Sequence, residues 1–391
     1  MLPKSRFVIA LASAYLFGNA QAVGTPFGLA AGTTGGGNAT PAVPSSLAEL
    51  TTWLSDSTPR VILLDKMFDF TSAEGTVTGT GCKPWTCSPN PQLAIDANNW
   101  CENYEPSAAK TTITYYKAGT TPLKVASNKT LLGKGSSGGI LGKGIKISGA
   151  SNIIIQNIKI GGFKRLVEGE LFAEVYLYAA SINPQFVWID HNTIQNIGRQ
   201  MIATGYGAVT ATTISNNVFN GDGTYSATCN GEHYWVALFT GSGDQITFAL
   251  NYLYKTSGRG PHVGTSGYYQ NVHAYNNYFV SVNGHAVDPE VGSKVLLEGN
   301  YFNAVTTPVL SGGGGQAYAP VSSSDAAACS SKLGRNCVTN IGLSSGALPG
   351  VATDTGTLNG FTSSVFKSAN IMAASSVGSY VQANSGIGKV N

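Results

Sequence analysis

The chain has 391 residues, enough for one large domain or two ordinary ones. Only 11% of its residues are charged, against about 25% in an average globular protein, and 49 are glycine. Low charge with abundant Gly, Asn, Ser and Thr favours strands and tight turns, so we expect an all-β protein. The 23 basic residues nearly balance the 20 acidic ones, which argues against nucleic acid or an anionic membrane as the main partner.

The first 22 residues have the features of a secretory signal peptide. Lys4 and Arg6 form a basic start, Phe7–Phe17 is mostly apolar, and small residues precede the expected cleavage point. This apolar run, like every later one, is shorter than the ~20 residues that span a membrane. We therefore expect a secreted, extracellular protein without a membrane segment. Two Asn-x-Thr sequences in turn-like contexts are candidate glycosylation sites, Asn38 and Asn128.

Six cysteines behind an export signal are expected to form disulfides. Cys329 and Cys337 are close neighbours and are expected to pair. Three more cysteines crowd between residues 82 and 101, so one of them must reach Cys229. A structural zinc site is the alternative, but it lacks the paired C-x-x-C spacing that such sites usually show.

The mature domain, residues 23–391, opens with a Gly-, Thr- and Pro-rich lead-in. Ser46–Asp56 then carries Leu and Trp residues at helical spacing behind a Ser cap, which predicts a short amphipathic helix. Arg60–Leu64 and Met67–Phe70 are predicted strands. A helix followed by strands suits the cap that covers the open apolar end of a solenoid.

From about residue 125 onward an irregular repeat appears, in which an apolar or β-branched run is followed by Asn and further β-formers. A β-sandwich has no reason to repeat this pattern, whereas one coil of a β-solenoid has this length. We expect stacked parallel strands with Asn at one corner, tolerating a left-handed bend and hydrogen-bonding along the column. The repeated residues are Asn157, Asn192, Asn217, Asn251, Asn277 and Asn300.

After Pro308 the repeat stops, and Gly312–Gly315 and a Ser/Ala-rich sequence follow. These residues are predicted to form loops packed on the outside of the solenoid. The expected fold is therefore all-β: a right-handed parallel β-helix of single-stranded solenoid type, with an N-terminal capping helix and external C-terminal loops.

Several segments resemble the fungal pectin lyases of the pectate lyase superfamily, polysaccharide lyase family 1. In chain order they are GTGCKPW, NNWCENY, WIDHNT, IGRQ, TYSATCNGEHYW, TSGRGPHV, HAYNNYF, NGHAVD and LLEGNYF. The resemblance runs from about residue 23 to the C-terminus and is dense between residues 186 and 303. It implies the β-helix fold and three disulfides: Cys82–Cys101, Cys87–Cys229 and Cys329–Cys337.

The resemblance implies an endo-acting lyase, and we expect a monomer that needs no metal or cofactor. Such enzymes cleave α-1,4-linked methyl-esterified galacturonan, the neutral form of pectin, by β-elimination and leave a 4,5-unsaturated sugar. Arg259 corresponds to the family's proposed base, and Arg199 to the arginine that supports charge on the substrate carboxyl group. Pectate lyases hold an acidic calcium ligand at the position of Arg199 and often a second arginine at that of Gly264. Both departures point to pectin and to calcium-independent chemistry.

Elimination of the C5 proton places enolate-like charge on the neighbouring carbonyl, which a fixed guanidinium stabilises in a dry cleft. Arginine is expected to keep its proton in a protein, so the role of base for Arg259 comes from the family alone. His262, next to the Arg-Gly-Pro turn, is a candidate substrate contact. Because aromatic faces pack on the C–H faces of sugars, five aromatic residues are predicted to line the groove: Trp85, Trp100, Trp188, Tyr234 and Trp235. Core packing is the alternative, and the resemblance places the four tryptophans at substrate-facing positions.

Asp190 and His191 are adjacent and suggest a catalytic dyad. Neighbouring residues on a strand point to opposite faces, so a structural role is the favoured interpretation. Asp190 would then hold a neighbouring coil, and His191 or Asn192 would join the polar column.

Residues 161–188 depart from the family pattern. Gly161–Ser181 matches no family segment, and a stretch that carries the family's catalytic-site aspartate is absent before Ile189. We interpret this as a retained intron with skipped exon sequence, which sequencing of the transcript tests. If the segment is real, Lys164–Ala180 is expected to form a loop or helix over the cleft. Two alternatives to pectin lyase therefore stand: a calcium-dependent pectate lyase and an inactive pectin-binding β-helix.

Overall fold

The computed structural model describes residues 22, 24–162, 175–178, 186–205 and 207–390. The signal peptide expected at residues 1–22 thus lies almost wholly outside the described residues. None of the described helices is long and apolar enough to cross a membrane.

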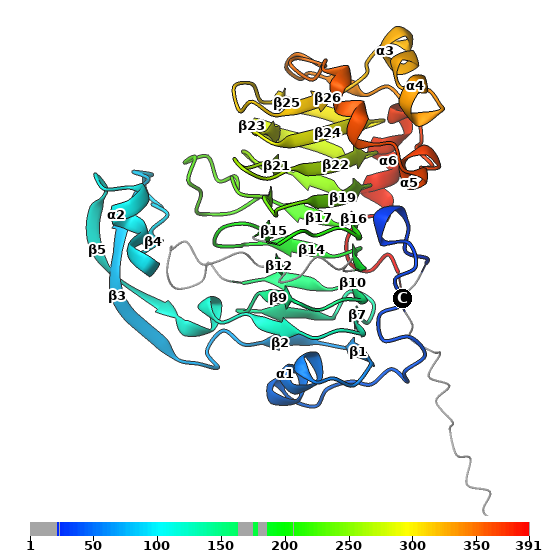
Figure 1. The fold of residues 1–391 in the computed structure, drawn as a ribbon. Coiled ribbons are helices and arrows are strands. Elements are labelled where there is room, and N and C mark those ends of the chain that lie inside the picture. The colour runs from blue at the N-terminus through cyan, green and yellow to red at the C-terminus, as the bar shows by residue number, and fades with distance from the viewer. Residues whose placement is uncertain (1–21, 23, 163–174, 179–185, 206, 391) are drawn as a thin grey trace, which may run out of the picture.

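The chain winds into stacked coils of parallel strands, which run from the blue to the orange end of Figure 1. One face of the stack is a sheet of strands in chain order: β1 (Arg60–Leu64), β7 (Lys129–Gly133), β10 (Ile153–Gln156), β13 (Val187–Asp190), β16 (Thr212–Ser215), β19 (Asp244–Ala249), β22 (Gln270–Tyr275), β24 (Ser293–Glu298) and β26 (Gln316–Tyr318). Every pairing along this sheet is parallel, as coil-on-coil stacking requires. The expected right-handed parallel β-helix is confirmed.

Two further faces complete each coil. The second face contains β2 (Met67–Asp69), β8 (Gly139–Leu141), β11 (Lys159–Gly161), β14 (Thr193–Gln195), β17 (Val218–Asn220) and β20 (Tyr252–Tyr254). The third contains β6 (Leu123–Val125), β9 (Ile145–Ser148), β12 (Val175–Tyr178), β15 (Ile202–Gly205), β18 (Ala237–Phe239) and β21 (His262–Val263). The long strand β23 (Tyr278–Pro289) bends and pairs with both faces, which joins them into one sheet.

The core is a column inside the coils. On the first face the inward residues stand in register from coil to coil, and all are fully buried: Ile155, Ile189, Ile214, Phe248, Ala274 and Leu297. β-Branched and aromatic side chains suit this pleated, enclosed surface. The apolar run before each repeated Asn is therefore the part of the coil that fills the interior.

The predicted asparagine column exists between the first and second faces. Each side-chain amide donates to the amide oxygen of the next residue at 3.0–3.1 Å, in the order Asn192, Asn217, Asn251, Asn277, Asn300 and Asn340. Asn340, which the sequence did not suggest, extends the column. The side-chain oxygens of the column also accept hydrogen bonds from backbone N–H groups of the preceding coil. The column therefore satisfies the hydrogen-bonding groups of a buried corner.

Two details of that prediction were wrong. The left-handed bend falls on the residue before the column, as at His191 (φ 52°) and Asn216 (φ 51°), and not on the column residue itself. Asn157 is left-handed (φ 58°) and donates to the Gly133 carbonyl, while the backbone N–H of Ile158 contacts Asn192. Asn157 therefore belongs to the bend and is offset by one residue from the column.

Replacing Asn251 by alanine is expected to lower the free energy of unfolding by about 3 kcal/mol, because buried partners lose their hydrogen bonds. Its amide donates to the Ile214 carbonyl at 2.9 Å and accepts from the backbone N–H of Asn217 at 3.1 Å. Urea unfolding measures the change, with Asn336→Ala at an exposed position as the matched control. Equal midpoints for the two variants would contradict the role of the column.

The N-terminal cap forms as predicted. Helix α1 (Leu47–Ser55) starts at Ser46, whose hydroxyl accepts from the backbone N–H of Glu49 at 3.1 Å. Its Leu50 and Leu54 are fully buried in the main core cluster, beside β1 and β6. The helix therefore closes the apolar end of the β-helix, as Figure 1 shows below β1.

A lobe outside the coils was not predicted from the sequence. Antiparallel strands β3 (Thr76–Lys83), β4 (Ala94–Ile95) and β5 (Ala109–Tyr116) form it together with helix α2 (Trp100–Tyr104). In Figure 1 the lobe stands to the left of the stacked coils. All three expected disulfides are present: Cys82–Cys101 within the lobe, Cys87–Cys229 between lobe and β-helix, and Cys329–Cys337 near the C-terminus.

The expected external C-terminal loops prove to contain helices. Helix α6 (Ala374–Asn384) lies against β23 and β25 (Tyr301–Val309), with Val377 and Val381 buried on Tyr278. Shorter helices α3 (Ser323–Ala328), α4 (Ser330–Leu333) and α5 (Ser364–Lys367) complete this region, with β27 (Ile341–Leu343) paired to β25. The Ser/Ala-rich composition hid these helices, because packing on the coils rather than propensity stabilises them.

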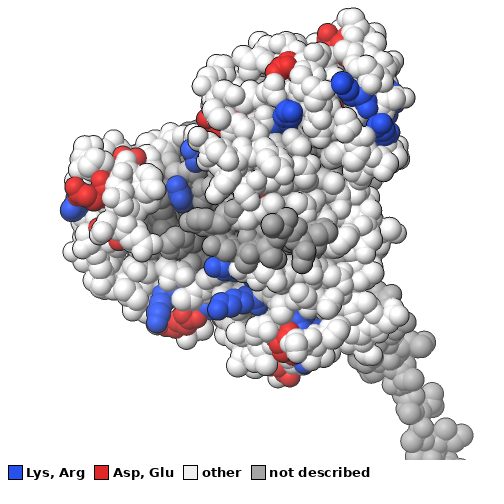
Figure 2. Space-filling view, in the orientation of Figure 1, with Lys and Arg blue, Asp and Glu red and all other residues white. Residues whose placement is uncertain are grey.

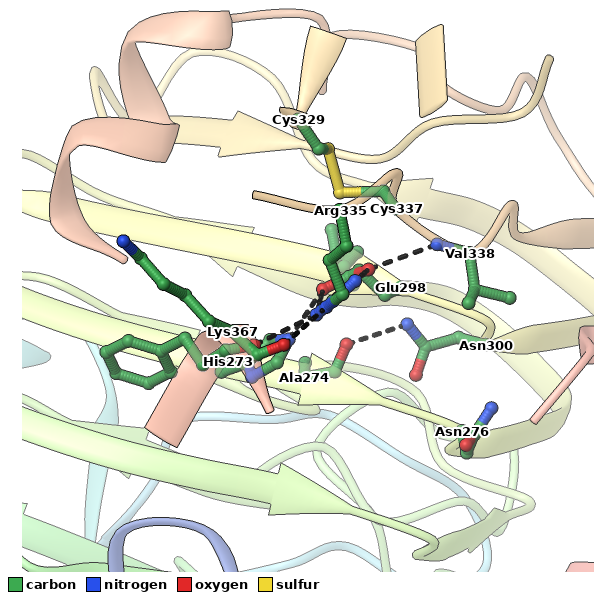
Figure 3. A network of polar contacts seen from close by, with 12 residues as sticks. His273, Ala274, Asn276, Glu298, Asn300, Cys329, Arg335, Cys337, Val338 and Lys367 are labelled. Atoms are coloured by element: carbon green, nitrogen blue, oxygen red, sulfur yellow. Dashed lines mark hydrogen bonds and ion pairs between the residues drawn. A yellow bond between two sulfur atoms is a disulfide. The ribbon is translucent and has the colours of Figure 1, made fainter. Parts of the chain in front are cut away.

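One buried ionic group fastens the C-terminal region to the β-helix (Figure 3). Arg335 donates two hydrogen bonds to the Glu298 carboxylate at 2.7 and 2.9 Å, and His273 contacts the same carboxylate at 2.9 Å. Burial would raise the pKa of Glu298, but the hydrogen bonds from Arg335 and His273 outweigh it and hold the pKa at about 2.

Glu298 is therefore expected to make the free energy of unfolding depend on pH in the acid range. Its pKa in the folded protein is depressed from 4.5 to about 2, so its contribution is full above pH ~4.5 and is lost as the pH falls towards 2. The shift corresponds to about 3 kcal/mol. Urea unfolding of the wild type and of Glu298→Gln across this window should give a stability difference that shrinks with falling pH. A difference that stays constant would show that the carboxylate charge is irrelevant.

The atypical segment contributes a strand. Val175–Tyr178 forms β12 and pairs in parallel with β9 and β15, so the third face is continuous through this coil. For these four residues the expected loop or helix over the cleft was wrong. The remainder of Lys164–Ala180 lies outside the described residues.

Candidate active site

The two predicted arginines and two of the predicted aromatic residues lie in loops that connect the second face to the third. Arg199 lies between β14 and β15, Tyr234 and Trp235 between β17 and β18, and Arg259 between β20 and β21. Backbone hydrogen bonds join these successive coils, from Met201 N–H to the Trp235 carbonyl at 3.1 Å and from Ala237 N–H to the Arg259 carbonyl at 2.8 Å. The two arginine loops are thus two strand spacings apart, about 10 Å.

The loop of Arg199 is held from two sides. The Gly198 carbonyl accepts from the lobe residue Gln92 at 3.0 Å. The Arg199 carbonyl contacts Nε2 of the buried His233 at 2.6 Å, and the same nitrogen contacts the Trp235 carbonyl at 3.0 Å. Because both partners are carbonyl oxygens, Nε2 carries the proton. The arginine therefore projects from a fixed backbone.

Arg259 adopts a left-handed backbone conformation (φ 52°) between two glycines. Its guanidinium lies 5.4 Å from the centre of the Tyr234 ring, a cation–π contact that sets its direction. Its Nε is buried and has no hydrogen-bond partner among the described residues. The side chain as a whole is half-buried, so the terminal nitrogens are the part left for a ligand.

The aromatic side chains of the lobe and the β-helix form one continuous row. Trp100 stacks on Tyr104 at 5.8 Å, Trp85 lies 6.5 Å from Trp100 and 5.2 Å from Trp235, and Tyr234 meets Trp235 edge-on at 5.5 Å. The row therefore crosses from the lobe to Arg259. Four of the five predicted aromatic positions are brought together in this way. Tyr104, 70% exposed at the end of the row, was missed.

Trp188 does not belong to this site, and its prediction as a groove residue was wrong. It is 3% exposed on β13, on the first face of the β-helix, where it packs with Ala30 and Ile154. Its indole N–H donates to Ser215 at 3.0 Å. Because Trp188 directly precedes Ile189 and Asp190 in this chain, it is part of strand β13.

Asp190 has the structural role that the sequence favoured. It is fully buried and accepts from Ser215 at 2.7 Å, Asn216 at 2.9 Å and Gln156 at 2.8 Å, so it links three coils. The two side chains do not point to opposite faces as expected, because the left-handed turn at His191 brings its Nδ1 to 2.5 Å from the Asp190 carboxylate. His191 thereby becomes another structural partner on the face away from Arg259.

His262 lies on β21, three residues after Arg259, and contacts the Asp288 carboxylate through Nδ1 at 2.5 Å. Burial opposes ionisation of Asp288, but the hydrogen bond from His262 outweighs it and lowers the Asp288 pKa. His262, Asp288 and Glu290 are the described residues whose metal-ligand atoms lie within 4.8 Å of one another. Because His262 and Asp288 already bind each other, we assign no ion to this group.

The glycosylation candidates differ in their surroundings. Asn38 is exposed on the N-terminal lead-in. Asn128 is half-buried in a left-handed turn, where its side-chain oxygen accepts from Asn152 at 2.8 Å. Asn38 is therefore the position with room for a glycan, and modification of either stays a prediction.

Figure 2 shows basic side chains near the border between the antiparallel lobe and the β-helix, on a face that is otherwise mostly uncharged. A row of rings and a pair of arginines suit an extended ligand with apolar faces and carbonyl or carboxyl groups. The fold and the site thus define a β-helix protein of the carbohydrate-binding or carbohydrate-cleaving class.

Comparisons with known proteins agree with this. The sequence model of the pectate lyase family matches residues 99–390. A probable pectin lyase F of Aspergillus niger is 45% identical over 387 residues, covering 94% of this chain and 75% of that protein. Pectin lyase B of Emericella nidulans is 43% identical, covering 97% of each. The chain belongs to the pectate lyase family, and the resemblance to fungal pectin lyases is confirmed.

Solved structures support the fold alone. A pectate lyase from Bacillus sp. N165, solved in complex with trigalacturonate, has a TM-score of 0.60 at 20% identity, covering 94% of this chain and all of that one. At this identity the likeness carries no information about individual site residues.

Proposed function

We propose that the protein is a secreted pectin lyase that cleaves α-1,4-linked methyl-esterified galacturonan by calcium-independent β-elimination. The observation that carries the proposal is that the loops of Arg199 and Arg259 lie on the same side of the β-helix, with the loop of Tyr234 and Trp235 between them. The similarity to fungal pectin lyases over nearly the whole chain supports the same substrate class.

The two guanidinium groups have complementary tasks. Loss of the C5 proton develops negative charge on the adjacent ester carbonyl, and a preorganised cation at that point lowers the barrier more than the same cation would in water. Arg259, whose terminal nitrogens are not held by a carboxylate in the described structure, is placed to meet the reacting sugar. Arg199 supports the carboxyl group of the same or the neighbouring unit.

The aromatic row explains a preference for esterified chains. Trp85 and Trp100 are partly exposed and offer flat apolar surfaces to sugar C–H faces, whereas Trp235, 6% exposed, packs against Trp85 from within the protein. A methyl ester is buried without the cost of desolvating a carboxylate. A calcium bridge is needed where a carboxylate must be neutralised, and Arg199 replaces the acidic ligand expected for such a bridge. The aromatic row and Arg199 together favour pectin over unesterified pectate as the substrate.

The test follows the ultraviolet absorbance of the unsaturated product. The purified protein is incubated with highly methylated galacturonan and, separately, with unesterified galacturonan, each with calcium and with EDTA. We expect product from the methylated polymer that EDTA does not change. Product only from the unesterified polymer, abolished by EDTA, would establish a pectate lyase instead.

A third outcome concerns the missing aspartate segment. Binding to methylated galacturonan in affinity electrophoresis without any unsaturated product would establish the inactive pectin-binding β-helix. Trp85→Ala, which interrupts the aromatic row between Trp100 and Trp235, separates binding from catalysis in the same experiment. It should weaken binding whether or not the chain turns over.

A further inference from the structure

The backbone of Arg259 is held by a side chain from the next coil. Its N–H donates to Nε2 of His285 on β23 at 3.1 Å, while its carbonyl accepts from Ala237 of the preceding coil at 2.8 Å. A non-glycine residue at φ 52° is strained by about 1–2 kcal/mol. The contacts to the N–H and to the carbonyl of Arg259 are what keep this residue in its conformation.

The His285 imidazole also packs against Gly258, the residue before Arg259. A Cβ at Gly258 would lie 2.5 Å from Tyr234 Cε2 and 3.1 Å from His285 Cε1, so the two rings enclose the residue before Arg259. Tyr234 meets His285 edge-on at 5.6 Å and also lies beneath the Arg259 guanidinium. His285 thus fixes the backbone of Arg259 and braces the ring that aims its side chain.

This arrangement requires a neutral imidazole. Because Nε2 accepts a hydrogen bond, the proton of the neutral ring lies on Nδ1. The charged groups that face the ring are Asp288, Arg259 and His262, and Nε2 lies 3.9 Å from the Asp288 carboxylate. A proton on Nε2 would therefore turn towards Asp288 and remove the acceptor of the Arg259 N–H.

We propose that His285 is a positioning residue, which holds Arg259 in its reactive conformation through neutral Nε2 and releases it when the imidazole is protonated. The inference rests on the proposed role of Arg259. Burial lowers the pKa of His285, Asp288 acts in the opposite sense, and Arg259 and His262 add to the lowering. The acid side of the activity profile should thus fall below the ordinary histidine value of 6.5.

The test compares two substitutions. His285→Gln keeps an acceptor near the position of Nε2 but does not titrate, whereas His285→Ala removes it. Losing this hydrogen bond should lower kcat by about 10- to 100-fold in the alanine variant, with KM little changed. The glutamine variant should keep most of the neutral-pH kcat and lose the acid limb. Thr307→Ala, at the position paired with His285 on the next coil, is the matched control.

Three results would overturn the proposal: wild-type kcat in His285→Ala, equal losses in both variants, or an unchanged acid limb in His285→Gln. Should the alanine variant not fold, the glutamine profile alone decides.

A readout without activity separates this proposal from the proposed function. The chain has five histidines, so 15N spectra of histidine-labelled protein resolve each tautomer, and the signal absent from His285→Gln identifies His285. An Nδ1-protonated neutral ring supports the inference even if the wild type gives no unsaturated product. An Nε2-protonated ring refutes it even if the wild type is active.

Discussion

Replacing Arg259 by alanine is expected to lower kcat on methyl-esterified galacturonan by about 10³-fold, the size of effect seen when a preorganised charge-stabilising group is removed. KM should change less, because the aromatic row from Trp100 to Tyr234 still binds the polymer. Rates of product formation under saturating substrate measure the effect. Arg259→Lys should recover only part of the activity, since an ammonium cannot present two parallel donors.

The control for this prediction comes from the same loop. Lys255→Ala removes a partly exposed cation that pairs with Asp222 at 3.2 Å on the surface, and it should leave kcat near the wild-type value. If Arg259→Ala were as active as Lys255→Ala, the assignment of Arg259 to the reaction would be wrong. Thermal unfolding of each variant shows whether any loss comes from misfolding.

Removing the Cys87–Cys229 disulfide by double alanine substitution is expected to have the second large effect. This bond closes a loop with a sequence separation of 142, against 8 for Cys329–Cys337. The chain-entropy relation gives losses of about 5 and about 2.5 kcal/mol in the free energy of unfolding. Urea unfolding of the two double variants tests the difference.

The same variant should also weaken substrate binding. Cys87 lies two residues after Trp85, so the disulfide holds Trp85 against Trp235 at 5.2 Å and keeps the row continuous. We expect a higher KM in the Cys87→Ala/Cys229→Ala variant and an unchanged KM in the Cys329→Ala/Cys337→Ala variant. Equal KM values would mean that the lobe keeps its position through other contacts, such as that of Gln92 with the Gly198 carbonyl.

Much of the site could be predicted from the sequence because its residues lie in short, recognisable motifs. Arg199 and Arg259 follow β-forming runs at the same point of two coils, and stacking places them on one side of the molecule. His285 was missed because its contact with Arg259 joins coils 26 residues apart, and a lone histidine after a glycine gives no signal. Tyr104 was missed because only the folding of the lobe places it on Trp100.

The sequence by itself determined the solenoid. The chain repeats apolar runs that are each followed by a polar corner, such as Ile153–Gln156 and Val187–Asp190. Such runs are stable as stacked strands of a solenoid, because their apolar side chains fill the interior and the corner amides hydrogen-bond from coil to coil. Because this pattern is local and repeated, it can be recognised in the sequence without knowing which strands pair.

Only the tertiary structure decided which face each remaining side chain occupies. Trp188 was assigned to the groove by its motif, yet its strand places it beneath the N-terminal lead-in; Val175–Tyr178, expected over the cleft, instead completes a sheet. The lobe, the C-terminal helices and the His285 contact depend on pairs of groups far apart in sequence. Their free energy arises from burial and hydrogen bonding across coils, which neither propensity nor periodicity along the chain encodes.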